Sequence, residues 1–139
     1  MSNITIPKKY TPSGGPIIDV EVDDATDPYE IGSVMSLSSG KAIPAAADAT
    51  RVGVVVSHYV KGSDTFVRLD IGGALVRNCV WSSHSSTPFT PIKWVDNQTV
   101  AARSTDLGKH GGVIARVVDA NTVDVLAVAA SVGDPGELN

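Results

Sequence analysis

The sequence lacks most of the features that mark secreted, membrane-spanning or disulfide-stabilised proteins. It contains a single cysteine, Cys79, which excludes an intrachain disulfide. No apolar run approaches the roughly 18 residues that a membrane-spanning helix needs. At Met1–Ile4 no basic segment precedes an apolar stretch, so we expect no secretory signal peptide and synthesis in the cytoplasm.

Positive charge and aromatic side chains are also scarce. The formal net charge is −4, and the only local basic pair is Lys8-Lys9. Binding to nucleic acid or to an anionic membrane generally requires a basic surface, so we expect neither partner. The chain has only two Trp, three Tyr and two Phe. We therefore expect an interior built mainly from small aliphatic side chains.

Small apolar residues and turn-forming residues are abundant. Hydrophobic residues make up 42% of the chain, which also contains 13 Gly and 8 Pro. Val and Thr favour β-strands, and frequent Gly and Pro favour tight turns between them. A chain of 139 residues fits one domain. The composition predicts an all-β fold, a small antiparallel β-barrel or sandwich with at most one short helix.

The first 16 residues predict an extended N-terminal arm. Apolar and polar residues alternate at its start, but Pro7, Pro12 and Pro16 prevent a long regular element. A flexible terminus is one interpretation. The other is an arm that becomes ordered on a partner, because its apolar residues would otherwise remain in water. On the second interpretation the partner-binding residues are Ile4, Ile6, Lys8, Lys9 and Tyr10.

Period-two alternation of apolar and polar residues predicts a β-domain over residues 17–130, followed by a flexible C-terminal tail over 131–139. Residues 44–50 are the only plausible helical segment, and they are too short to be stable without packing on a sheet. The predicted strands are 17–22, 31–37, 52–60, 65–71 and 74–80, then hairpins 92–95/99–102 and 113–118/122–129.

Residues 52–80 predict a three-stranded antiparallel meander. In its first strand the even positions form an apolar face that includes His58, which we expect to be a core histidine. In its second strand we expect Asp70 to point outward. The two turns are Lys61–Asp64 and Gly72-Gly73, since Gly reaches positive φ without a steric penalty. The inward residues of the second strand are Val67, Leu69 and Ile71.

Cysteine and histidine show no spacing typical of a metal or catalytic site. The three histidines and Cys79 do not form a recognised set of zinc ligands. A nucleophile–base pair of Cys79 and His84 lacks a recognisable orienting group. We expect Cys79 to be a small buried hydrophobic residue.

Acidic and glycine-rich segments give no ligand site either. The carboxylates of Asp23, Asp24 and Asp27 lack the spacing of a calcium-binding EF-hand loop, so we expect a solvated turn. The segment 108–112 lacks the glycine and hydroxyl positions of a phosphate-binding loop. We predict no catalytic centre, no metal and no cofactor, and therefore a protein that is not an enzyme.

Three of the few aromatic residues gather near the polar, proline-containing segment 81–91. They are Trp81, Phe89 and Trp94. Aromatic side chains anchor both hydrophobic cores and interfaces. Core packing is one interpretation of these residues, and a contact with another subunit or a partner is the other.

Over residues 30–80 the expected elements follow a distinctive order. A strand begins at Ile31-Gly32-Ser33-Val34, and a turn at Ser39-Gly40-Lys41 leads to the Ala-rich stretch 45–50. The strand Val52-Gly53-Val54-Val55-Val56 follows, then a hairpin and the segment Val67–Ala74 with its Gly-Gly pair. This order, over about half of the chain, resembles the small β-rich decoration (cement) proteins of tailed-bacteriophage capsids.

The resemblance implies a β-tulip-like barrel or sandwich with an extended arm. Proteins of this family bind the outer surface of an assembled capsid, often as trimers between capsomers, and resist the pressure of packaged DNA. It therefore implies a structural virion protein, located on the outer capsid surface, that stabilises contacts between capsomers. The implied partners are the major capsid protein and further copies of the chain in a homotrimer. The alternative is a carbohydrate- or receptor-binding β-module of a phage head fibre or tail, whose Trp81–Trp94 loop stacks on sugar rings.

Overall fold

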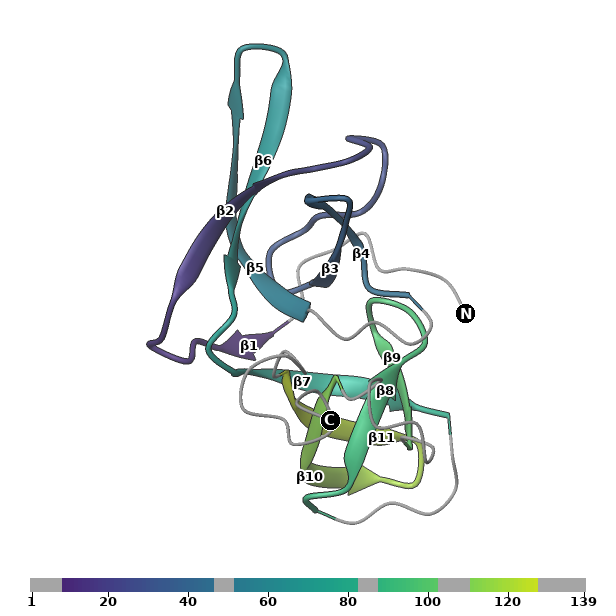
Figure 1. Ribbon diagram of the computed structural model, residues 1–139. Coiled ribbons are helices and arrows are strands. Elements are labelled where there is room, and N and C mark those ends of the chain that lie inside the picture. The colour runs from purple at the N-terminus through teal and green to yellow at the C-terminus, as the bar shows by residue number, and fades with distance from the viewer. Residues whose placement is uncertain (1–8, 47–51, 83–87, 103–110, 128–139) are drawn as a thin grey trace, which may run out of the picture.

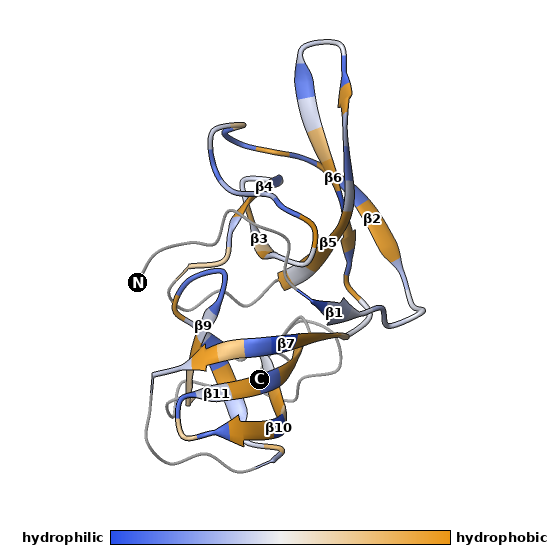
Figure 2. Ribbon diagram, turned by 180° about the vertical axis from the view of Figure 1, so that it is seen from behind, coloured by the Kyte–Doolittle hydropathy of each residue, from blue (hydrophilic) through white to orange (hydrophobic). Residues whose placement is uncertain are grey.

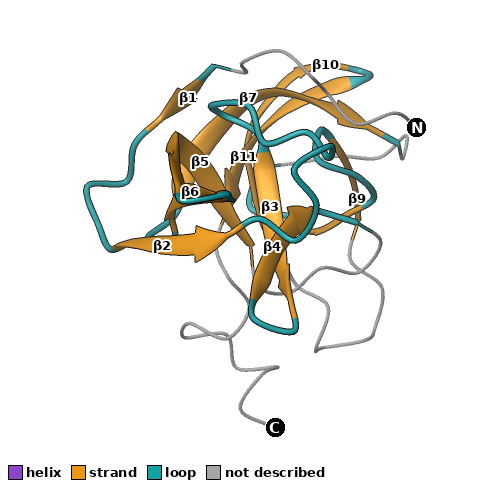
Figure 3. Cartoon of the chain, turned by 90° about the horizontal axis from the view of Figure 1, so that it is seen from above, coloured by secondary structure: helices purple, strands orange, loops and turns teal. Residues whose placement is uncertain are grey.

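The computed structural model describes residues 9–46, 52–82, 88–102 and 111–127. These residues form eleven β-strands and no helix (Figure 3), which confirms the predicted all-β class. Accordingly, this part of the chain has no helix that could cross a membrane. The predicted tail, 131–139, lies outside the described residues, as do residues 1–8 of the predicted arm.

The strands after β1 form two groups, one following the other along the chain. In space, the short strand β1 lies between these two groups (Figure 1). The first group is a five-stranded sheet in the order β2-β6-β5-β3-β4. Its members are β2 (Ile17–Glu21), β3 (Val34–Ser38), β4 (Lys41–Pro44), β5 (Val52–Lys61) and β6 (Asp64–Asp70). The second group is a closed five-stranded barrel in the order β7-β11-β10-β8-β9, to which β1 is added. Its members are β1 (Tyr10–Thr11), β7 (Ala74–Trp81), β8 (Pro91–Trp94), β9 (Thr99–Ala102), β10 (Gly112–Asp119) and β11 (Thr122–Ala127).

Strand β7 closes the barrel because one of its edges is shared by two short strands. β11 pairs along β7 on one side, and β9 runs parallel to the end of β7, with Val80 opposite Thr99. The beginning of the same edge is occupied by β1, with Tyr10 opposite Val76. The N-terminal segment therefore covers the part of the β7 edge that the barrel leaves open.

The five-stranded sheet curls until its two outer strands meet at one point. Val22, just after β2, forms a parallel bridge with Ala42 in β4, and the N–H of Asp23 donates to the Ala42 carbonyl at 2.9 Å. This curl encloses a small apolar core, in which Val20, Val67 and Leu69 are buried as their alternation predicts.

The first half of β5 belongs to both cores. Val54 packs in the cluster that fills the barrel, and Val55 packs in the cluster inside the curled sheet. Strands buried on both faces read as continuous apolar runs, as residues 52–56 do. Figure 2 shows hydrophobic stretches in both groups, in β2, β5 and β6 and in the barrel strands β7, β10 and β11. The shared strand joins the two groups into one structure.

The predicted meander is correct only in its first half. β5 and β6 form the expected hairpin, but β6 pairs with β2 on its other side, and β7 begins the barrel instead. Gly72-Gly73 is therefore the crossover between the two groups and not a hairpin turn. Gly72 lies against the segment of Gly15, where an added Cβ would stand 2.6 Å from the Ser13 hydroxyl oxygen.

His58 is exposed, so the expected core histidine is wrong. A β-bulge between Val55 and Ser57 shifts the register with β6 and changes the faces to which the following side chains point. The His58 ring instead meets Tyr29 edge-on, with ring centroids 5.1 Å apart. A run of valines does not reveal where a bulge lies. The period-two alternation therefore assigned the side chains in the second half of this strand to the wrong face.

Other predicted elements fit the structure closely. The hairpins β8–β9 and β10–β11 form as expected within the described residues, and Cys79 is fully buried.

The segment 44–50, expected to be helical, begins instead as strand, because Pro44 is the last residue of β4 and pairs with Met35. The remainder of that segment, 47–50, lies outside the described residues.

Candidate functional site

The two tryptophans predicted for the core or for a contact lie in the barrel core. Trp94 is fully buried and Trp81 is 3% exposed, and both belong to the same apolar cluster. The indole N–H of Trp94 donates to the Gly111 carbonyl at 3.0 Å, which fixes the ring across the barrel. Neither ring offers a face to a partner, so the structure favours the core-packing interpretation for these two.

Phe89 differs from both tryptophans because its ring lies in water. It is 83% exposed, more than any other large hydrophobic residue in the described part of the chain. Its backbone has φ of +69°, a conformation that bulky side chains rarely adopt. The Phe89 N–H donates to the Ile114 carbonyl at 2.7 Å, and the Ile114 N–H donates to the Thr90 carbonyl at 3.0 Å. The turn is thus fixed on β10 while the ring points away.

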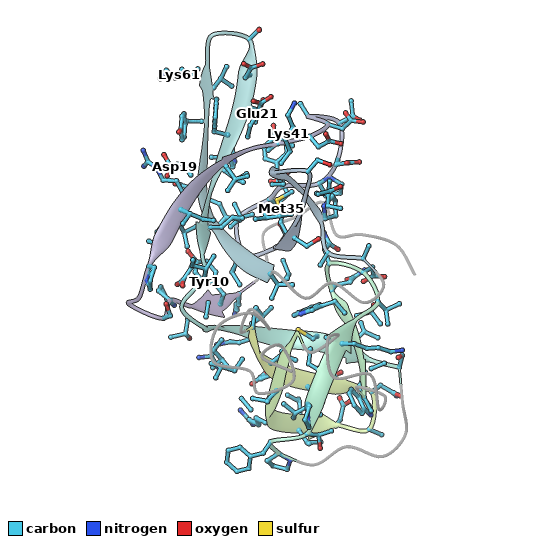
Figure 4. All side chains as sticks on the ribbon, in the orientation of Figure 1. Tyr10, Asp19, Glu21, Met35, Lys41 and Lys61 are labelled. Carbon is cyan, nitrogen blue, oxygen red and sulfur yellow. The ribbon has the colours of Figure 1, made fainter. Side chains whose placement is uncertain are left out.

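The described part of the predicted arm is docked on the barrel. Tyr10 is partly buried against the barrel cluster (Figure 4), and the Arg77 N–H donates to the Lys9 carbonyl at 3.1 Å. The Arg77 guanidinium also donates to the Thr11 hydroxyl at 3.0 Å. Lys9 is exposed. The other predicted arm residues, Ile4, Ile6 and Lys8, lie outside the described residues.

A buried carboxylate fastens the arm to the junction of the two strand groups. Asp70 was expected to point outward, but it is 1% exposed. It accepts hydrogen bonds from the backbone N–H of Ser13 at 2.8 Å, from the Ser13 hydroxyl, and from the N–H of Gly72 at 3.0 Å. These bonds replace the hydration that the carboxylate loses, and so the outward prediction fails.

An aromatic and charged cluster on the β5–β6 hairpin is a feature that the sequence prediction missed. Tyr59 and Phe66 are directly opposite across the hairpin, with ring centroids 5.4 Å apart and planes at 9°. The Arg68 guanidinium lies 5.1 Å from the centre of the Tyr59 ring. The sequence did contain the information needed to predict this pair. A two-residue turn at Gly62-Ser63 fixes the register of the hairpin, and this register places the two rings opposite each other.

Asp19 on β2 holds this cluster in place. Its carboxylate accepts a hydrogen bond from the Tyr59 hydroxyl at 2.8 Å and lies 3.5 Å from Nε of Arg68. The hydrogen bond to Asp19 is the main cause that raises the pKa of Tyr59 above its usual value. The neighbouring pair of Glu21 and Lys41, 3.3 Å apart, links β2 to β4 in the same way. Figure 4 shows Asp19 and Glu21 along β2 and Lys61 near the tip of the hairpin.

Side chains that could ligate a metal ion do not cluster in the described part of the chain. Residues 9–46, 52–82, 88–102 and 111–127 contain no cluster of three His, Cys, Asp or Glu side chains that could hold a metal ion. In the acidic turn, the N–H and hydroxyl of Thr26 donate to Asp24, and these bonds lower the pKa of its carboxyl. His84 lies outside the described residues, so the structure does not test the rejected pair of Cys79 and His84.

A scan of family models finds no match to the chain, and searches of curated proteins and of solved structures find no significant match either. The candidates for a functional site are therefore taken from the structure itself, and they are two surface features. They are the fixed turn that presents Phe89 and the hairpin that carries the Tyr59 cluster.

Proposed function

We propose that this chain is a structural virion protein that binds the outer surface of an assembled phage capsid and stabilises contacts between capsomers as a trimer. The resemblance over residues 30–80 is the origin of this proposal. The described residues support a binding function, because the exposed Phe89 on a turn bonded to β10 and the aromatic pair on the β5–β6 hairpin suit contact with another protein.

The presentation of Phe89 is the observation that carries the proposal. A left-handed backbone costs a bulky residue about 1–3 kcal/mol, and an aromatic ring in water forgoes its burial energy. Both effects oppose stability, and burial of the ring against a partner would recover the burial energy. Aromatic anchors presented in a fixed conformation lose little entropy on binding, which suits a contact made many times over one shell.

The arm supplies a second contact in this proposal. Lys9 begins the described residues, and β1 and the Ser13–Asp70 bonds fasten the following segment to the molecule. Residues 1–8 precede this anchored point and alternate Ile with polar residues at 3–6. A segment of that composition can add a strand to the sheet edge of a capsid subunit.

The carbohydrate-binding alternative loses its main support. It placed the sugar contact on the Trp81–Trp94 loop, in which the rings of both tryptophans are 3% and 0% exposed and only Phe89 is at the surface. A sugar-binding function would have to use other aromatic residues. The capsid function needs neither ring at the surface.

Co-sedimentation with shells tests the proposal. Purified shells of the phage that encodes this chain are mixed with the wild-type protein, with Phe89→Ala and with Val118→Ala as a matched control, since Val118 is also exposed, at 41%. We expect Phe89→Ala to weaken binding at least about tenfold, as loss of a buried aromatic anchor does, and Val118→Ala to bind like the wild type. Equal binding of all three proteins would remove Phe89 from the contact, and no binding by any of them would contradict the proposal.

A further inference from the structure

The far half of β5 has one edge without a neighbouring strand. β3 pairs with β5 only at Val52–Val54, and the N–H and carbonyl of Val55 bond to Ser33 and Gly32. From Ser57 to Lys61 no described strand lies along this edge, and the hairpin projects beyond the rest of the sheet (Figure 1). The other edge of the hairpin, on β6, is covered by β2.

The register of the hairpin determines which backbone groups face this open edge. In an antiparallel pair alternate residues direct their N–H and C=O toward the partner strand, and the others direct them away. The Thr65 carbonyl accepts a hydrogen bond from Val22, so Thr65 faces β2 and away from β5. Its cross-strand partner is Val60, and His58 stands two residues earlier. The backbone groups of His58 and Val60 therefore face outward.

The middle of this open edge lacks the usual protection against pairing. Natural edge strands are commonly guarded by proline, by a bulge or by a charge within the strand. Ser57–Val60 contains no proline and no Asp, Glu, Lys or Arg, and the β-bulge and Lys61 lie at its two ends. Val60 is a β-branched apolar residue that is 67% exposed. The hairpin is also stiffened by the Tyr59–Phe66 pair, so the edge is already in the shape that a paired strand needs.

We propose that the β5 edge pairs with the same edge of a second copy of this chain, antiparallel, about a twofold axis that passes beside Tyr59. The outward backbone groups fix the register: His58 of each copy stands opposite Val60 of the other. Tyr59 then stands opposite its own counterpart, in a position where cross-strand side chains lie closest. The two Tyr59–Phe66 pairs become one aromatic row across the contact.

The self-complementarity of the edge is the reason to assign it to a second copy. A twofold contact uses one patch twice, so each residue must tolerate its reversed counterpart. In this register the charged Lys61 faces the neutral Ser57 of the second copy, and no like charges are opposite each other. The contact goes beyond the proposed capsid function and does not depend on it. It is also separate from the threefold contact that the resemblance implies.

The size of the edge sets the strength to expect. Stable protein interfaces bury about 1,200–2,000 Å² in total, and a ladder of four or five residues buries much less. The free protein should therefore associate weakly and reversibly, with a dissociation constant of about 0.1–1 mM. A single charge at the centre of the edge is enough to prevent so small a contact.

Sedimentation velocity and amide exchange of the full chain test this pairing. From about 10 µM to about 1 mM we expect the sedimentation coefficient of the wild type to rise toward that of a dimer, and amide exchange at His58 and Val60 to slow. Val60→Lys, at a largely exposed position, should raise the dissociation constant at least about tenfold. Val118→Lys, at another exposed strand position, should associate like the wild type.

Three results would overturn the proposal. They are a wild type that stays monomeric over the whole range, a Val60→Lys variant that associates like the wild type, and equal loss in both variants. None of these depends on capsid binding, because shells are absent from the measurement. A failure here would therefore leave the proposed function intact, and a failure of shell binding would leave this contact intact.

Discussion

The Tyr59 hydroxyl donates a hydrogen bond to Oδ2 of Asp19 at 2.8 Å, and this bond reaches from β5 over β6 to β2. The two residues are 40 positions apart in the sequence. The bond joins the projecting hairpin to the curled sheet at its base, and Arg68 on β6 completes the connection from the strand between them. These two contacts therefore connect the base of the hairpin to β2.

The bond makes the ionisation of Tyr59 sensitive to Asp19. Because the hydroxyl donates to a carboxylate, the folded protein holds the pKa of Tyr59 above its unfolded value. The resulting stabilisation is complete below the ordinary tyrosine pKa of about 10 and is lost as the pH rises through the raised value. We expect Asp19→Asn to lower this pKa, as followed by NMR of the tyrosine ring carbon. An unchanged titration in the variant would show that Asp19 is not the cause.

Asp70 provides a test of how the arm is fastened. Asp70→Ala leaves the N–H groups of Ser13 and Gly72 and the Ser13 hydroxyl without their acceptor, so we expect a loss of about 1–3 kcal/mol in the free energy of unfolding. Urea denaturation measures it. Asp64→Ala, at the exposed hairpin turn, is the control and should change stability by less than about 0.5 kcal/mol. Similar losses in the two variants would contradict the fastening role.

Gly112 tests the closure of the barrel. Its φ is +144°, and an added Cβ would overlap the Leu126 carbonyl oxygen on the neighbouring strand. We expect Gly112→Ala to lose more than about 3 kcal/mol of stability or to fail to fold. Gly40 also has positive φ but open space around it, so Gly40→Ala should lose only about 1–2 kcal/mol. Equal effects in thermal unfolding would mean that the overlap is relieved by a small shift of β11.

Phe89 allows stability and binding to be separated. Asn tolerates a left-handed backbone better than Phe does, so Phe89→Asn should relieve strain and leave the midpoint of thermal unfolding equal or higher. The same variant removes the ring and should lose shell binding. A variant with lowered stability would show that the ring supports the fold, against the anchor role.

The sequence predicted strands and their inward residues well where alternation is undisturbed. Val67 and Leu69, and the hairpins of the barrel, follow the period-two pattern. It failed where one tertiary contact overrides the pattern. Asp70 is inside because Ser13, 57 residues away, supplies its hydrogen bonds, and no local rule reveals a partner at that distance.

In the candidate sites, too, some features follow from local sequence patterns and others depend on tertiary contacts. The exposure of Phe89 and the burial of the two tryptophans could not be told apart by residue type, because all three are aromatic residues near one proline-containing segment. Their places depend on which strands close the barrel, and that topology includes the parallel β7–β9 pair, which no local pattern predicts. The Tyr59–Phe66 pair, in contrast, follows from the turn at Gly62-Ser63 and could have been found.

The central claim is that this chain binds and stabilises an assembled capsid, and the thermal stability of shells tests it most directly. Shells of the phage that the proposal implies, purified without the protein, are heated with and without a saturating amount of it, and their disassembly is followed by light scattering. We predict saturable binding and a higher disassembly temperature in its presence. Shells that bind no protein and come apart at the same temperature would contradict the claim.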